Sequence, residues 1–131
     1  MILFVCDRNA SLSPMAEAIA SHYAPHLNIQ SAGERPSHVR VEVIRALAEQ
    51  RIFSNGLTSK SIHAVDWEEV QEVVVLVPKI QSPRIPSKYT VQYWELPDPQ
   101  WSPLEERMEA MRDLRDELMR RIIRLLEQLE L

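Results

Sequence analysis

The fold is decided near the start of the chain by residues 2–17, which read ILFVCDRNASLSPMAE. The run from Ile2 to Val5 is apolar and contains β-branched side chains, which favours a short buried strand of a parallel sheet ending at Cys6. Ser13 and Pro14 then supply a cap and a proline for the first helical position, so they predict that a helix opens there. These sixteen letters therefore predict a strand, a tight loop and a helix.

The same alternation continues along the rest of the chain. Further strands are predicted at 28–32, 73–77 and 91–96, and further helices at 39–50 and from 104 to the end. Strands that alternate with helices favour a parallel sheet with right-handed crossovers and helices on both faces. We therefore expect a three-layer α/β/α fold with a four-stranded parallel sheet. A chain of 131 residues, 45% of them hydrophobic, suits a single domain over 1–131.

Composition excludes several classes of function. The formal net charge of −4 argues against nucleic-acid binding, which relies on clustered Lys and Arg. No apolar run approaches the roughly 20 residues that cross a bilayer, so we expect no membrane partner. The apolar start is too short for the core of a signal peptide, and we expect a cytoplasmic protein. The amphipathic last helix belongs to the core, and its length is also compatible with a homodimer.

Cys6 is the only cysteine, which excludes an intrachain disulfide and a multi-cysteine zinc site. A lone cysteine at the end of an apolar strand is usually a small buried hydrophobe. This one, however, precedes a helix, where free backbone N–H groups bind anions. The helix dipole and the Ser13 hydroxyl would lower the thiol pKa and make Cys6 a nucleophile. His22 and His26 lie four apart but lack a third ligand, so we expect no metal and no cofactor.

The segment from Val5 to Glu17 resembles the phosphate loop of the low-molecular-weight protein tyrosine phosphatase and arsenate reductase family. That loop has a cysteine, five residues, an arginine and a serine, followed by a helix that begins Met-Ala-Glu. Two more segments are similar to family motifs in the same order: Ser31-Ala32-Gly33 after the second strand, and Trp94-Glu95-Leu96-Pro97-Asp98-Pro99, which resembles the general-acid loop. The shared order and spacing make the resemblance specific.

The resemblance implies a phosphate loop between the first strand and the first helix, and a two-step phosphoryl transfer. Cys6 would attack phosphorus, Asp98 would protonate the leaving group, and water would then release phosphate with Asp98 as base. Ser13 would assist Cys6, and Trp101, with Trp94 behind it, would line the substrate cleft. The implied phosphate-binding residues are Asp7, Arg8, Asn9, Ala10, Ser11, Leu12 and Ser13.

This sequence departs from the family pattern at several loop positions. Leu12 stands where the family has the arginine that chelates phosphate oxygens, and such a cation typically supplies about two to five orders of magnitude in rate. Arg8 replaces a glycine, and Asp7 adds a negative charge. Arg8 or Arg35 would have to reach back to replace the lost charge. Ser11 stands where many relatives carry a second cysteine.

Three functions follow from these residues. The first is a low-molecular-weight tyrosine phosphatase-like hydrolase, slowed by Leu12 and acting on a phosphotyrosine protein or a small aryl phosphate. The second is a catalytically silent pseudophosphatase that keeps the pocket as a binding or regulatory module. The third is an arsenate reductase that uses an external thiol, since Cys6 has no partner cysteine in this chain. A low-pKa Cys6 would favour the first.

Overall fold

The computed structural model describes residues 1–129. Four strands alternate with three α-helices, and short 3₁₀ helices occupy several connections. The elements in chain order are β1 Ile2–Cys6, α1 Leu12–Tyr23, β2 Ile29–Gly33, α2 Val41–Glu49, η1 Ile62–Ala64, η2 Trp67–Glu69, β3 Glu72–Val75, η3 Lys79–Gln81, β4 Val91–Tyr93, η4 Pro99–Trp101 and α3 Leu104–Gln128.

The strands form one parallel sheet in the order β2-β1-β3-β4. In its register Cys6 pairs with Gly33, and Val5 lies between Ala32 and Val75. All five residues of β1 are buried, as expected for a central strand covered on both faces. The carboxyl ends of β1 and β2 therefore lie side by side, and the loop after Cys6 opens at that edge of the sheet.

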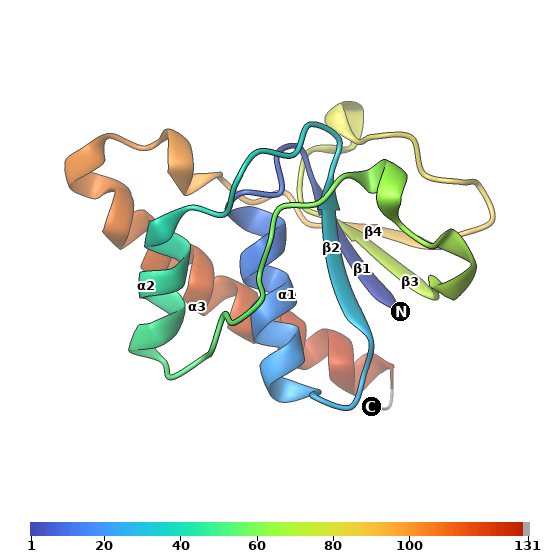
Figure 1. Ribbon diagram of the computed structural model, residues 1–131, viewed down its shortest axis with the longest axis horizontal. Coiled ribbons are helices and arrows are strands. Elements are labelled where there is room, and N and C mark those ends of the chain that lie inside the picture. The colour runs from blue at the N-terminus through green and yellow to red at the C-terminus, as the bar shows by residue number, and fades with distance from the viewer. Residues whose placement is uncertain (130–131) are drawn as a thin grey trace.

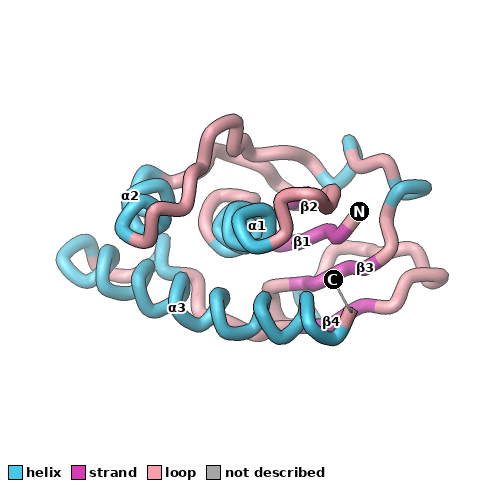
Figure 2. The backbone as a smooth tube through the Cα atoms, turned by 90° about the horizontal axis from the view of Figure 1, so that it is seen from below, coloured by secondary structure: helices cyan, strands magenta, loops and turns pink. Residues whose placement is uncertain are grey.

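The layers are visible in two views. Figures 1 and 2 show α1, α2 and α3 together on one side of the sheet, with α1 beside β1 and β2. The short green turns η1 and η2 lie on the other side, where Trp67 packs against Tyr89 at 5.4 Å between ring centroids. The predicted α/β class with a four-stranded parallel sheet is confirmed. The second face differs from the expected helical layer, because 3₁₀ helices and loops cover it rather than α-helices.

The apolar stripe of α3 is buried in the hydrophobic core. Met111, Leu118 and Ile122 are fully buried, and α3 packs against α1 and α2. Burying side chains of this size typically stabilises a fold by about 1.5–3 kcal/mol each. This packing holds α1 against the sheet. It therefore also fixes the position of the loop between β1 and α1. Within residues 1–129, no helix combines the length and apolar character needed to cross a membrane.

Element ends differ from the sequence predictions by a few residues. Helix α1 begins at Leu12 with Ser11 in the cap position, not at Pro14 with Ser13 as the cap. Pro14 is compatible with this because first-turn N–H groups have no intrahelical partner. Strand β4 ends at Tyr93 rather than at residue 96, although the ladder continues for one more hydrogen bond, from Trp94 N to Val75 O, 2.8 Å.

Candidate active site

The loop between β1 and α1 is held by its carbonyl groups. The carbonyls of Asp7, Arg8 and Ala10 accept hydrogen bonds from backbone N–H groups in the segment 35–40, at 2.8–3.1 Å. Because the carbonyls bond outward, the loop N–H groups are left to the inner side. The backbone N–H groups of Asn9 and Ser13 approach the Cys6 sulfur. This is the arrangement of an anion-binding loop at a helix N-terminus.

Two residues make the tight turn possible. Asn9 takes the left-handed conformation with φ of 48°, which asparagine tolerates better than most residues. Gly33 lies under the loop, where a Cβ atom would stand 2.6 Å from the Asp7 carbonyl oxygen and 2.7 Å from the Asn9 nitrogen. Arg8 has no positive φ, so the glycine that the family pattern expects there is not needed for backbone geometry.

Cys6 lies at the base of the loop and is only 3% exposed. Its sulfur and the Ser13 hydroxyl share a hydrogen bond of 2.8 Å. Burial raises the pKa of the Cys6 thiol above the ordinary value of 9.0, since the hydrogen bonds from Ser13 and Asn9 only partly offset the loss of water. The charge of Asp98 raises that pKa further. This direction is opposite to the predicted low pKa, since within residues 1–129 no cation lowers the Cys6 pKa enough to offset burial of a thiolate.

A buried polar network supports the loop from behind. The Asn9 amide donates to Ser13 Oγ at 2.8 Å and to Ser31 Oγ at 2.9 Å. Ser31 donates in turn to Glu17 at 2.6 Å, and the Lys60 ammonium lies 3.2 Å from the same carboxylate oxygen. The Lys60 backbone N–H donates to the Asn9 side chain at 2.6 Å. Sequence reasoning assigned no role to Lys60 or Glu17, and their separation along the chain gives no signal of this contact.

Asp98 reaches the loop from the start of η4. Its Oδ1 accepts a hydrogen bond from Ser11 Oγ at 2.5 Å and one from the Gln100 backbone N–H at 3.1 Å. Its Oδ2 accepts from the Gln100 side-chain amide at 2.8 Å. The structure therefore brings Asp98, which the family resemblance singled out, to the loop between β1 and α1. It also brings Gln100 there, which sequence reasoning missed.

A pocket of about 250 Å³ opens beside the loop, lined by Arg8, Leu12, Asp98 and Trp101 among others. Leu12 is 3% exposed and contributes an apolar wall. Trp101 is 67% exposed, and the Arg8 guanidinium lies over its ring at 5.4 Å from the centroid. Within residues 1–129, no hydrogen-bond partner meets the buried Nε of Arg8. Arg8 is thus the cation that this pocket presents.

The charge of Arg35 is engaged at the outer face of the loop. Arg35 binds the Asp7 carboxylate through two hydrogen bonds, of 3.0 and 2.6 Å, and holds the pKa of Asp7 below its usual value. Arg35 is therefore engaged by Asp7 and does not reach the Cys6 side. Over residues 1–129, no three His, Cys, Asp or Glu side chains cluster as metal ligands would.

Trp94 does not lie in this pocket, in contrast to the prediction. It is 8% exposed and packs against Phe4, with 6.3 Å between ring centroids, under α3. The reason is the alternation of side chains along a strand: Trp94 follows Tyr93 directly and faces the helical layer. Trp101, seven residues later, is the aromatic side chain that borders the loop.

Comparison with known proteins agrees with this geometry. A sequence model of the family "Low molecular weight phosphotyrosine protein phosphatase" matches residues 1–131. An arsenate reductase of Shouchella clausii is 28% identical over 127 residues, covering 93% of this chain and 91% of that protein.

Solved structures share the fold. An arsenate reductase in its phosphate-binding state superposes with a TM-score of 0.82 at 26% identity, covering 97% of this chain and 96% of the other. A low molecular weight protein tyrosine phosphatase from T. tengcongensis superposes with a TM-score of 0.78 at 23% identity and 97% coverage of both chains. The match over the whole chain shows that this protein belongs to the low molecular weight phosphotyrosine protein phosphatase family.

Proposed function

We propose that the chain hydrolyses phosphomonoesters through a covalent cysteinyl-phosphate on Cys6. The observation that carries the proposal is the convergence of three groups at one loop. Cys6 and Ser13 lie 2.8 Å apart at its base, and Asp98 is joined to the loop through Ser11 at 2.5 Å. A nucleophile, a hydroxyl that stabilises its thiolate, and a carboxylic acid are the parts that two-step phosphoryl transfer requires.

In the first step the Cys6 thiolate attacks phosphorus and the bond from phosphorus to the ester oxygen breaks. Asp98, protonated, gives its proton to the departing oxygen, for which the Ser11 hydrogen bond has to be exchanged. In the second step water attacks the phosphocysteine, and Asp98 accepts a proton from it. Phosphate leaves and the thiolate is restored, with Ser13 donating to its sulfur.

Charge limits the rate of this chemistry. Burial raises the pKa of the Cys6 thiol above its ordinary value, which reduces the share of thiolate available for attack. Leu12 contributes no donor to the equatorial phosphate oxygens. We propose that Arg8, whose Nε has no partner among the described residues and which lines the pocket, supplies part of the missing charge. It is held over Trp101 rather than at the base of the loop, so its contribution is weaker than that of a loop arginine.

The proposed substrate is a phosphotyrosine protein or a small aryl phosphate. The exposed ring of Trp101 borders the pocket, and a phenyl group can pack against it while the phosphate enters toward Cys6. A pocket of about 250 Å³ has room for one such ring. The family description, which names phosphotyrosine, supports this class.

Arsenate reduction is the second candidate, favoured by the 28% identical arsenate reductase. Cys6 would attack arsenate and displace water, forming an S–As bond. A thiol from outside the chain would then attack the Cys6 sulfur, forming a mixed disulfide and releasing arsenite, so that two electrons pass from sulfur to arsenic. The external thiol is required because Cys6 is the only cysteine.

The test measures para-nitrophenyl phosphate turnover by the native chain and by Cys6→Ser, between about pH 5 and 9. The proposal expects slow native turnover well above the Cys6→Ser background, and a phosphorylated Cys6 in acid-quenched samples by mass spectrometry. A parallel assay follows arsenite release from arsenate with glutathione. Arsenite release without ester hydrolysis favours the second candidate, whereas phosphate binding without either reaction indicates a silent binding module and refutes hydrolysis.

A further inference from the structure

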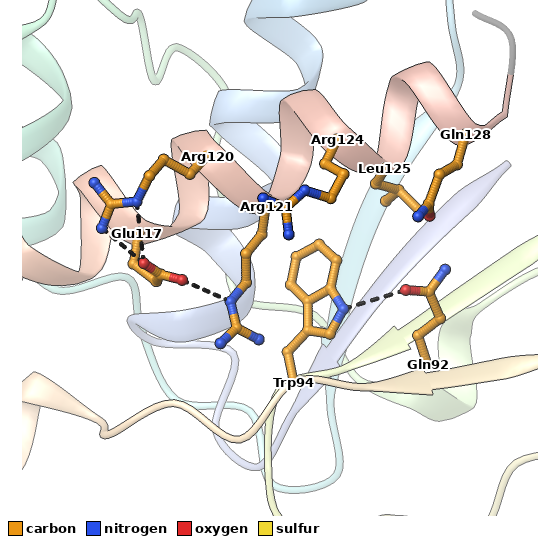
Figure 3. A pocket seen from close by; sticks show the side chains of 8 residues that line it. All are labelled: Gln92, Trp94, Glu117, Arg120, Arg121, Arg124, Leu125 and Gln128. Atoms are coloured by element: carbon orange, nitrogen blue, oxygen red, sulfur yellow. Dashed lines mark hydrogen bonds and ion pairs between the residues drawn. The ribbon is translucent and has the colours of Figure 1, made fainter.

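A second pocket, of about 450 Å³, lies between β4 and the C-terminal half of α3. Figure 3 shows Gln92 and Trp94 rising from the strand side, and Arg121 and Arg124 reaching from the helix around the indole ring. It shares no lining residue with the pocket beside the loop between β1 and α1. We call it the arginine groove. The phosphoryl-transfer chemistry proposed above makes no use of it.

The arginine groove concentrates positive charge in a chain whose net charge is −4. Arg120, Arg121 and Arg124 line it with a single carboxylate, Glu117. Glu117 accepts from Arg120 at 2.7 Å and from the Nε of Arg121 at 2.9 Å, and the two arginines hold its pKa below the usual value. Within residues 1–129, the terminal N–H groups of Arg121 have no hydrogen-bond acceptor, since only its Nε donates to Glu117. Arg124 makes no hydrogen bond or ion pair with any other residue of the described range 1–129.

The spacing of arginines along α3 adds a modest like-charge repulsion at the groove. Arg120 and Arg124 are four residues apart, the spacing at which like charges on a helix repel each other. Arg121 adds a third positive charge to the same groove, and its guanidinium lies 5.9 Å from the centroid of the Trp94 ring. Glu117 balances only part of this charge. An anion between Arg121 and Arg124 would remove the remaining repulsion.

The opposite wall also offers a donor. Trp94 Nε1 donates to Gln92 Oε1 at 3.3 Å, so the Gln92 carbonyl is occupied and its amide N–H₂ is turned elsewhere. Figure 3 shows this amide on the side of the groove that faces α3. Donors from strand and helix therefore converge, and Glu117, already bonded to two arginines, is the acidic group on the lining. A ligand suited to such a site is rich in acceptors.

We propose that the arginine groove binds a small, multiply charged oxyanion through Arg121, Arg124 and Gln92. Its volume lies in the usual range for small-molecule sites and exceeds what one phosphate fills. Its lining carries three arginines and one carboxylate, a surplus of positive charge that a ligand with at least two anionic groups would balance. Guanidinium forks match phosphate and carboxylate equally well. The ligand is thus a polyphosphate or a polycarboxylate, and the experiment separates the two.

The three tryptophans give the test its readout. Trp94 lies in the arginine groove, Trp101 borders the Cys6 loop, and Trp67 packs on Tyr89 away from both pockets. Their indole N–H signals in a ¹⁵N-correlated NMR spectrum, assigned with single Trp→Phe variants, therefore report each place separately. The labelled full chain is titrated with pyrophosphate and, separately, with citrate at constant ionic strength.

The expected result is a saturable shift of the Trp94 signal with an unchanged Trp67 signal. Arg124→Gln should weaken binding about tenfold, because one charge-assisted contact is lost. Arg112→Gln is the matched control, since Arg112 lies on the same helix but pairs with Glu49, and it should leave the affinity unchanged. Preserved dispersion of the remaining signals shows that each variant is folded.

The outcomes decide the proposal and the ligand class. Binding of pyrophosphate alone assigns the polyphosphate class, binding of citrate alone assigns the polycarboxylate class, and binding of both assigns multiply charged oxyanions in general. No shift of Trp94 with either anion up to about 10 mM, a shift confined to Trp101, or equal affinity in Arg124→Gln would overturn the proposal. None of these outcomes depends on hydrolysis at Cys6.

Discussion

Leu12→Arg should raise phosphatase activity by about three orders of magnitude. The Leu12 side chain lines the same pocket as Asp98 and Arg8, so an arginine there can extend toward the phosphate. A guanidinium about 4 Å from a phosphate oxygen, at an effective dielectric constant near 20, contributes about 4 kcal/mol, which corresponds to roughly 10³ in rate if realised in the transition state. Losing the buried leucine costs about 1.5–3 kcal/mol of stability, and nearby Asp98 compensates part of the added charge.

The assay compares kcat/KM for para-nitrophenyl phosphate in the native chain, Leu12→Arg and Leu12→Gln. Leu12→Gln is polar without charge, so it separates the effect of a cation from that of a hydrogen-bond donor and should gain less than tenfold. Urea unfolding checks that both variants are folded. A folded Leu12→Arg that binds phosphate more tightly, yet turns over within tenfold of the native chain, would show that charge is not the limiting factor.

Three further predictions concern the loop. Gly33→Ala should lower the free energy of unfolding by about 2 kcal/mol or more and abolish phosphate binding, because the new Cβ would stand within 2.6–2.7 Å of backbone atoms of Asp7 and Asn9. Urea titration measures the loss of stability, and calorimetry measures phosphate binding. The rate of Cys6 alkylation by iodoacetamide should keep rising from pH 7 to beyond pH 9, the ordinary pKa of a thiol, and a plateau of the rate near pH 7 would contradict this. The free energy of unfolding should fall above about pH 9, because the folded state holds the thiol proton more tightly than the unfolded state does. Ser13→Ala should slow alkylation at pH 8 severalfold, since the 2.8 Å hydrogen bond that favours the thiolate is lost, and an unchanged rate would remove Ser13 from this role.

The arrangement of strands and helices follows from the sequence because the signals are strong and local. β1 has a continuous apolar run and α3 has an apolar stripe at helical spacing, and both elements form where these patterns indicate. The 3₁₀ helices were not predicted because three residues carry no period. For η1, η2 and η4 the signal is a side-chain cap instead: Ser61, Asp66 and Asp98 each accept a hydrogen bond from the backbone N–H two residues on. The turn η3 follows Pro78 and has no side-chain cap.

Sequence motifs indicated the contacts within the loop after β1 but not the contacts that distant segments make with it. Cys6, Asn9 and Ser13 lie in one loop, so their meeting follows from the order of the sequence. The support from Lys60 depends on the path of the connection between β2 and β3, which no local pattern encodes. The expected low pKa of the thiol was wrong because the helix dipole and one hydroxyl do not offset nearly complete burial.

The raised pKa of Cys6 and the binding of phosphate both depend on the charge available in the loop. Burial raises the thiol pKa, and Leu12 supplies no cation that would lower it. A thiolate and a phosphate dianion are both anions in the same loop, and in this chain both depend on N–H groups, one hydroxyl and the more distant Arg8. A thiol that keeps its proton does not repel an incoming phosphate, whereas the attack requires the thiolate. A cation at position 12 would favour both anions, so Leu12→Arg should increase alkylation rate and phosphate affinity together. If only one of them increases, the two properties are set by separate groups, and geometry rather than charge controls the other.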